Sequence, residues 1–140
     1  MTDTPVSLES LMVPKRSVTV DFPGLEGMQV EITYLARSEL LKIRKKCVTT
    51  KFNRSTRQPE EAFNEDKFLV EYCKAVIQGW SGFKYQYLEE LLLVDISKLD
   101  PVDNFPFTQD NAQTLMKNSP DFDTWVTDTV GDLENFTMNK

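Results

Sequence analysis

FTQDNAQTLMKNSPDFDTWVTDTVGDLENF, residues 107–136, predicts two helices with a clear boundary between them. Ser119 stands at an N-cap position, where its hydroxyl can accept a hydrogen bond from an otherwise unpaired backbone amide. Pro120 follows at the first helical position, which needs no amide donor, and Asp121 and Asp123 suit the positive end of the helix. The side chains of one helix face then recur at three- and four-residue steps: Phe122, Trp125, Val126, Thr129, Leu133 and Phe136.

Upstream of this stretch, the same signals predict three more helices, over residues 39–50, 64–78 and 85–94, and the first helix of the stretch itself is expected over residues 109–118. Ser38 and Thr108 stand where the first and the last of them need an N-cap, and Gly79 follows the second at a position where helices commonly end. The helix over residues 85–94 contains LLLV, which also fits a short buried strand.

Residues 17–36 have a different pattern. SVTVDF and MQVEITYL alternate apolar with polar residues on either side of PGLEG, and this arrangement predicts a β-hairpin. Because an isolated hairpin is barely stable in water, its apolar face is expected to cover helices. We therefore predict an α+β fold, mainly α, in which an N-terminal β-hairpin packs on about five amphipathic helices.

The chain of 140 residues is long enough for one domain with a core of its own. Residues 1–16 are polar, contain prolines and are expected to form a flexible N-terminal tail. The single domain is expected over residues 17–136, with 137–140 as a short C-terminal tail. Within the domain, the polar residues 51–63 predict an exposed loop.

The residue types present disfavour an enzyme. The sequence has no histidine, which removes the commonest general base and the commonest metal ligand. Cys47 and Cys73 fall within apolar helical patterns, so we expect buried free thiols. Asp95, Asp100 and Asp103 do not have the spacing of a calcium loop, and no glycine-rich phosphate loop occurs. We expect no enzyme activity, no cofactor and no metal site.

Charge is distributed unevenly along the chain. Residues 37–57 hold eight Lys or Arg and one Glu, a net +7, so the remainder carries −13 of the total −6. The overall sign disfavours nucleic acid and anionic membranes as partners, and no apolar run approaches the ~20 residues of a membrane span. Four lysines are candidates for a patch that docks an acidic partner or the acidic surface of another copy: Lys42, Lys45, Lys46 and Lys51. The alternative is a solvated helix face.

Four aromatic residues are candidates for contacts with a partner, because they lie beside predicted turns. Trp80 and Phe83 belong to GWSGF, in which two glycines bracket the tryptophan. Phe105 and Phe107 flank Pro106 at the end of the connector over residues 95–106. Core packing is the alternative role for each of these rings.

The order of these motifs resembles the tail assembly chaperones of long-tailed bacteriophages. A hairpin leads into LARSELL, a second helix ends in IQGWSGF, and FTQDNAQTLMKNSPDFDTWV precedes a final amphipathic helix. Members of that family commonly carry such a W-x-G segment and an N-A-x-x-L…P-x-F-x-x-W-V ending. The resemblance extends from Val18 to Phe136, almost the whole chain.

The resemblance implies a non-enzymatic function in the host cytoplasm. Such a chaperone binds the tape measure protein, keeps it soluble, helps to recruit tail tube subunits and is absent from the mature virion. Many members also exist in a longer, frameshifted form whose added part contacts the tail tube protein. A further hypothesis, from the charge distribution, is a homo-oligomer around the client, with the +7 segment of one copy on an acidic surface of the next.

Two other functions fit the same sequence. One is a structural tail completion or connector component that stays in the virion. The other is a small acidic inhibitor or adaptor of a host protein, although the basic residues 37–57 argue against mimicry of DNA.

Overall fold

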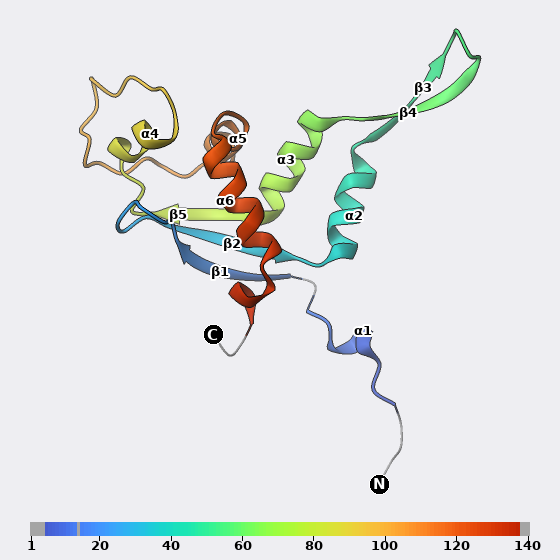
Figure 1. Ribbon diagram of the computed structural model, residues 1–140, viewed down its shortest axis with the longest axis horizontal. Helices are drawn as coiled ribbons and strands as arrows, with labels where there is room; N and C mark the ends of the chain where they lie inside the picture. The colour runs from blue at the N-terminus through green and yellow to red at the C-terminus, as the bar shows by residue number, and fades with distance from the viewer. Residues whose placement is uncertain (1–4, 14, 138–140) are drawn as a thin grey trace.

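An antiparallel sheet forms the base of the fold in the computed structural model, which describes residues 5–13 and 15–137 (Figure 1). Its strands are β1 (Lys15–Asp21), β2 (Gln29–Leu35) and β5 (Ile77–Ser81), in the order β1-β2-β5. In the register of the first pair, Val18 lies opposite Ile32. Because side chains alternate across a strand, this register collects the apolar residues on one face of the sheet.

Three helices cover that face. α3 (Glu65–Val76) and α6 (Pro120–Gly131) pack on β2, and α5 (Gln109–Asn118) packs against both of them. The largest fully buried side chains between these helices and the sheet are those of Phe83, Phe122, Met28, Ile32, Ile77 and Leu115. The hydrophobic core therefore lies in one layer, between the sheet and α3, α5 and α6.

The caps predicted at the ends of the last two long helices are present. The Thr108 hydroxyl accepts a hydrogen bond from the Asn111 amide at 3.0 Å. The Ser119 hydroxyl, which is fully buried, accepts from the Phe122 amide at 3.2 Å. These side chains replace water as partners of the first backbone amides, which is why the boundary at residues 118–120 is sharp.

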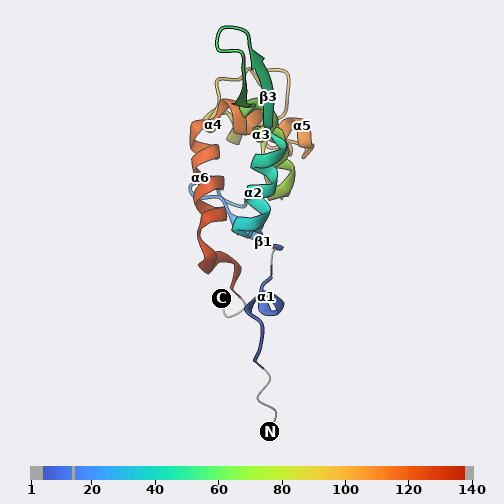
Figure 2. The same cartoon turned by 90° about the vertical axis from the view of Figure 1, so that its right-hand side faces the viewer.

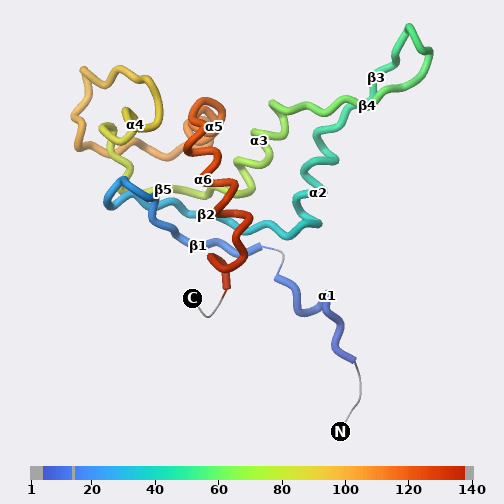
Figure 3. The backbone as a smooth tube through the Cα atoms, in the orientation of Figure 1, coloured from blue at the N-terminus to red at the C-terminus, as the bar shows by residue number. Residues whose placement is uncertain are grey.

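A helix and a ribbon extend the fold to one side. α2 (Arg37–Lys46) follows β2 and contains no buried residue. β3 (Val48–Asn53) and β4 (Gln58–Phe63) then form an antiparallel two-stranded ribbon. Figure 3 shows this ribbon projecting away from the body. On the opposite side lie α4 (Tyr85–Leu91) and the long connector that leads to α5 (Figure 1).

Short helical turns lie near both ends of the described chain. α1 (Leu8–Leu11) is exposed within the segment that we expected to be a flexible tail. A 3-10 turn, η1 (Leu133–Phe136), follows α6 and packs against β1. Its Phe136 carbonyl accepts a hydrogen bond from Arg16 at 3.1 Å. Residues 1–4, 14 and 138–140 lie outside the described residues, so the outer parts of both predicted tails are not tested.

The mixed α/β class predicted from the sequence is confirmed, at 45% helix and 25% strand. β1 and β2 pair antiparallel where the hairpin was predicted, but the predicted arrangement lacks a third strand, which residues 77–81 (IQGWS) add beside β2. α3 ends at Val76, and residues 77–81 pair with β2. Gly79 therefore lies within a strand rather than after a helix. Pairing with the free edge of β2 supplies hydrogen bonds that another helical turn would have supplied locally.

Most of residues 51–63 are exposed, but they belong to a ribbon rather than a loop. The turn is built by Asn53, whose side chain accepts hydrogen bonds from the amides of Ser55 (2.8 Å) and Thr56 (3.3 Å). Arg57 adopts a positive φ of 56°, which completes the reversal of the chain. An asparagine whose side chain accepts a hydrogen bond from the amide two residues later favours a tight turn. This turn lets the two flanking strands pair, although the polar composition of the segment had predicted a loop.

Three helix boundaries also differ from the prediction. α2 begins at Arg37 after Ala36, so Ser38 lies inside the helix and provides no cap, and the helix ends at Lys46. α4 ends at Leu91, so the last apolar residues of LLLV belong to the connector. α6 ends at Gly131, before the 3-10 turn. At the end of α2 the strand β3 follows almost at once, and after α6 the chain enters η1.

Candidate binding grooves

The four aromatic residues predicted as partner contacts pack against one another. Trp80 lies 5.1 Å from Phe83, 5.3 Å from Phe105 and 4.9 Å from Phe107, measured between ring centroids. The Trp80 indole N–H donates to the Phe105 carbonyl at 2.9 Å, and Phe83 is fully buried. The cluster therefore fastens the connector to β5. Its packing explains all four rings, and a contact with a partner stays a prediction.

Three of the four predicted lysines share a groove beside α2. Lys42, Lys45 and Lys46 line a space of about 560 Å³, which we call the basic groove. Lys51 is not among them, because it lies on the ribbon opposite Glu60. The other lining residues are Lys15, Glu39, Glu71 and Lys74, above an apolar floor of Leu35, Ile43 and Ala75.

The basic groove carries a net positive charge. Five lysines against two glutamates give +3. Within the described residues the only ion pair joins the Lys42 ammonium to the Glu39 carboxylate at 3.5 Å, and the Lys42 side chain is 70% exposed. An exposed pair of this kind contributes little, so most of the positive charge of the groove is compensated by solvent alone.

A second groove lies on the other side of α2, between α2 and α6. Its space is about 420 Å³, and Glu65, Phe68, Leu69 and Tyr72 of α3 are among its lining residues. Figure 2 shows α6 on the left and α2 to its right. We call this second groove the apolar groove, because its lining consists mainly of Leu40, Phe63, Phe68, Leu69, Tyr72 and Met116, with Arg44, Glu65, Asp123 and Thr127 at its margins.

Three aromatic rings form a continuous row in the apolar groove. Phe68 lies 5.5 Å from Phe63 and 5.5 Å from Tyr72 between ring centroids. The Arg44 guanidinium lies 5.2 Å from the centre of the Phe68 ring, within the range of a cation–π contact. Burial raises the pKa of the Tyr72 hydroxyl above its ordinary value of 10.0, so this end of the row stays neutral even at mildly alkaline pH. The groove is therefore suited to bind apolar side chains.

The sequence did not reveal the apolar groove. Phe63 stood at the end of a predicted loop, and Phe68 and Tyr72 belonged to the expected core stripe of a helix. The structure leaves Phe63 43% exposed, while Phe68 and Tyr72 are half-buried. One sequence signal could have pointed to the groove. Phe68 and Tyr72 are four residues apart on one helix face, and Phe63, just before that helix, is an aromatic residue on an otherwise polar segment.

Cys73 is fully buried, and its burial has a consequence at alkaline pH. Burial raises the pKa of its thiol from 9.0 to about 12. Between these two values the unfolded chain releases the thiol proton while the folded chain retains it, so stability falls as pH rises. The buried, protonated Cys73 thiol therefore makes its full contribution to the free energy of unfolding below about pH 9, and this contribution is lost towards about pH 12.

We expect urea unfolding to reveal this effect when wild type is compared with Cys73→Ala at several pH values. The stability advantage of wild type should shrink above about pH 9, by up to ~1.4 kcal/mol for each pH unit. Other groups that titrate in this range affect both proteins equally. A difference that stayed constant with pH would contradict the assignment.

No protein-family model, curated protein or solved structure matches the chain. Within the described residues, no group of acidic or cysteine side chains is arranged to hold a metal ion. None of the helices in that part of the chain is long and apolar enough to cross a membrane. The two grooves on either side of α2 combine charged or aromatic side chains with an apolar lining.

Proposed function

We propose that this protein is a non-enzymatic assembly chaperone for the tail of a long-tailed bacteriophage, and that it binds the tape measure protein in the apolar groove. The observation that carries the proposal is the row of Phe63, Phe68 and Tyr72 between α2 and α6. The order of motifs along the chain, which resembles that chaperone family, supplies the identity of the client.

The apolar groove suits one face of an amphipathic helix. Such a helix places apolar side chains at three- and four-residue steps, and an open groove between two helices accepts a stripe of this kind. Arg44 stands at one margin, and Glu65 and Asp123 stand at others. Charged residues beside the apolar stripe of the client can therefore pair with these margins, which favours one orientation of the bound helix.

A long helical client needs such a cover before it assembles. Large exposed apolar faces associate with one another, so an unassembled tape measure protein aggregates unless a partner shields them. The groove is small, at about 420 Å³, and α2 beside it buries none of its residues. A contact of this size, with the exposed helix α2 as one side, favours modest affinity for the client. Modest affinity is needed because the client must later be released.

The proposal includes the wider setting of that family. The protein acts in the host cytoplasm, helps to recruit the tail tube protein, through a longer frameshifted form where one is made, and leaves before the virion is complete. Proteomics of purified virions separates this function from that of a retained tail component. A signal with the stoichiometry of a tail protein would contradict the chaperone function.

Co-expression with the tape measure protein tests the groove directly. We expect the wild-type chain to keep the client in the soluble fraction, and Phe63→Ser with Phe68→Ser to lose most of that effect. Truncation of central aromatic contacts commonly weakens binding by roughly 30-fold or more. Phe52→Ser is the matched control, because Phe52 is a phenylalanine on the same ribbon, 67% exposed and outside the groove.

Circular dichroism of each variant establishes that it folds before the solubility of the client is compared. Tyr72→Phe serves as a second variant, because it keeps the ring and is expected to retain binding. Equal solubility of the client with wild type and with the doubly substituted, folded variant would show that the client binds elsewhere.

A further inference from the structure

The end of the molecule opposite α2 is acidic. We call residues 89–103 the acidic connector. It holds five carboxylates and one lysine, a net charge of −4: Glu89, Glu90, Asp95, Asp100, Asp103 and Lys98. All six of these residues are exposed.

The acidic connector also exposes apolar side chains on an ordered loop. Leu93 is 105% exposed and Val102 is 59% exposed. Hydrogen bonds hold the backbone around them: the Asp95 carboxylate accepts from the Ser97 amide at 2.9 Å, and the Asp100 carboxylate accepts from the Val102 amide at 3.1 Å. Nothing in the described part of the chain covers Leu93. Exposed leucine and valine beside carboxylates are typical of a contact surface.

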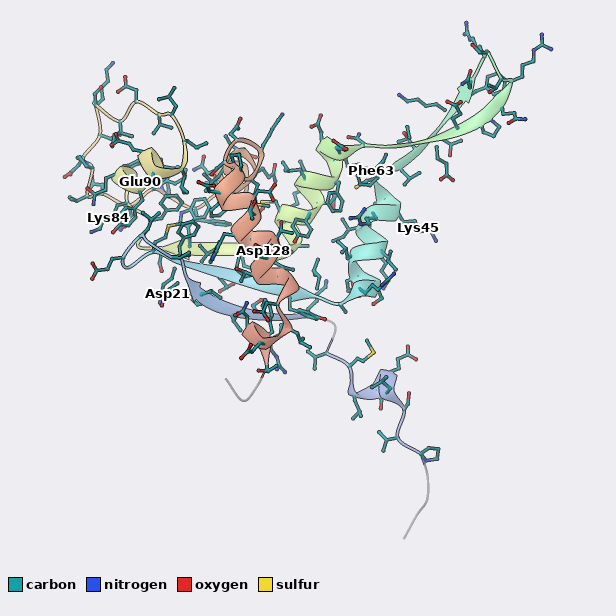
Figure 4. The ribbon with its side chains drawn as sticks, viewed as in Figure 1. Asp21, Lys45, Phe63, Lys84, Glu90 and Asp128 are labelled. Carbon is teal, nitrogen blue, oxygen red and sulfur yellow. The ribbon has the colours of Figure 1, made fainter. Side chains whose placement is uncertain are left out.

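The acidic connector and the basic groove lie at opposite ends of the same chain. Figure 4 labels Glu90 at one end of the long axis and Lys45 towards the other. α4 and α2 stand correspondingly on the two sides of α3 and α6 in Figure 1. The two surfaces therefore cannot meet within one molecule, although two copies placed end to end bring them together.

We propose that the acidic connector of one copy docks in the basic groove of the next copy. The charges are complementary, −4 on the connector and +3 on the groove. The apolar components match as well, because Leu93 can cover the floor formed by Leu35 and Ile43. A docked pair still has one free groove and one free connector, so the contact is heterologous and extends into a head-to-tail array.

This contact is separate from the proposed client site. Leu40 and Arg44 of α2 line the apolar groove, whereas Lys42, Lys45 and Lys46 line the basic groove. The inference does not rest on the identity of the client. It does replace the expected patch, because Lys51 lies outside the groove and Lys15 and Lys74 lie within it.

Several observations favour a second copy over nucleic acid as the occupant. The chain as a whole carries −6, which repels a polyanion at long range. No aromatic ring is among the residues that line the basic groove, so bases have no surface on which to stack. The groove has an apolar floor, which suits leucine better than phosphate.

Two half-variants test the proposal by sedimentation. The groove variant carries Lys42→Glu, Lys45→Glu and Lys46→Glu, and the connector variant carries Glu89→Lys, Glu90→Lys and Leu93→Ser. We expect the wild-type chain to associate increasingly with concentration, and each variant alone to associate at least roughly tenfold more weakly. An equimolar mixture should form a complex of two chains and stop there, because one intact connector meets one intact groove.

Salt and a matched substitution complete the test. Wild-type association should weaken between about 0.05 M and about 0.5 M NaCl, because the charges are exposed to solvent. Lys51→Glu, which changes a lysine on the ribbon outside the groove, should associate like wild type.

Three results would overturn the proposal. They are a wild-type chain that stays monomeric at high concentration, folded half-variants that associate like wild type, and a mixture that forms no complex. Tight binding of a labelled single-stranded DNA oligonucleotide that the groove variant loses would also overturn it, in favour of nucleic acid.

Discussion

Gly82→Ala is expected to destabilise the protein severely, by at least about 3 kcal/mol, because it combines backbone strain with an overlap of atoms. Gly82 has φ +66°, a conformation that L residues rarely adopt. A Cβ atom built there lies 2.8 Å from the backbone carbon of Gly27 and closer still to its carbonyl oxygen. Since the obstacle is backbone and not a flexible side chain, the turn after β5 and the turn between β1 and β2 must separate.

Gly79→Ala is the matched control for this prediction. Gly79 lies three residues earlier in the same segment, and a Cβ atom there meets nothing within 4 Å. We expect Gly79→Ala to change stability by less than about 1 kcal/mol. Thermal unfolding followed by circular dichroism should show Tm lowered by roughly 10 °C or more for Gly82→Ala and little changed for Gly79→Ala. Similar values for the two variants would show that the turns are not in contact.

These two glycines illustrate what local sequence signals can and cannot predict. Two glycines around Trp80 correctly indicated a tight turn, and Gly82 provides it. Gly79 was interpreted as the end of a helix, because a glycine after an apolar stripe commonly has that role. The segment instead pairs with β2, which is more than forty residues away in the chain. No pattern within residues 64–83 contains that information.

The helix signals that succeeded are those whose partners are close in the chain. Thr108 and Ser119 cap the helices that they were predicted to cap, because each hydroxyl bonds an amide three residues later. Ser38 had an equally good local pattern, yet α2 begins one residue before it. There β2 ends at Leu35, and the chain enters the helix directly through the buried Ala36.

The grooves were predictable only in part, for the same reason. Lys42, Lys45 and Lys46 share one side of α2 because they are three and four residues apart. Lys15, at the start of β1, and Lys74, on α3, join them only through the tertiary fold, because both line the same groove. The apolar groove required the positions of α2, α3 and α6 together, so Phe63 and Phe68 carried no recognisable signal on their own.

Phe122→Ala is expected to have the largest effect among the aromatic substitutions. Phe122 is fully buried in the first turn of α6, and its ring stacks on Phe22 at 6.0 Å with an angle of 17° between the planes. Phe22 also meets Trp125 at 4.7 Å, so this group joins α6 to the β1–β2 hairpin. Removing such a ring leaves a cavity and destabilises by about 3–5 kcal/mol, out of a total of about 5–15 kcal/mol for an ordinary domain.

Phe52→Ala is the matched control, because it removes the same atoms from a ring that is 67% exposed and should change stability by less than about 0.5 kcal/mol. Urea unfolding measures both variants, and Phe122→Leu should recover part of the loss of stability because it fills part of the cavity.

Asp123 and Thr127 of α6 line the apolar groove, so a loosened α6 should also weaken client binding. If Phe122→Ala changed the free energy of unfolding only slightly, α6 would be held in place mainly by its caps and its other contacts. The α6 side of the apolar groove would then not depend on the Phe122 ring.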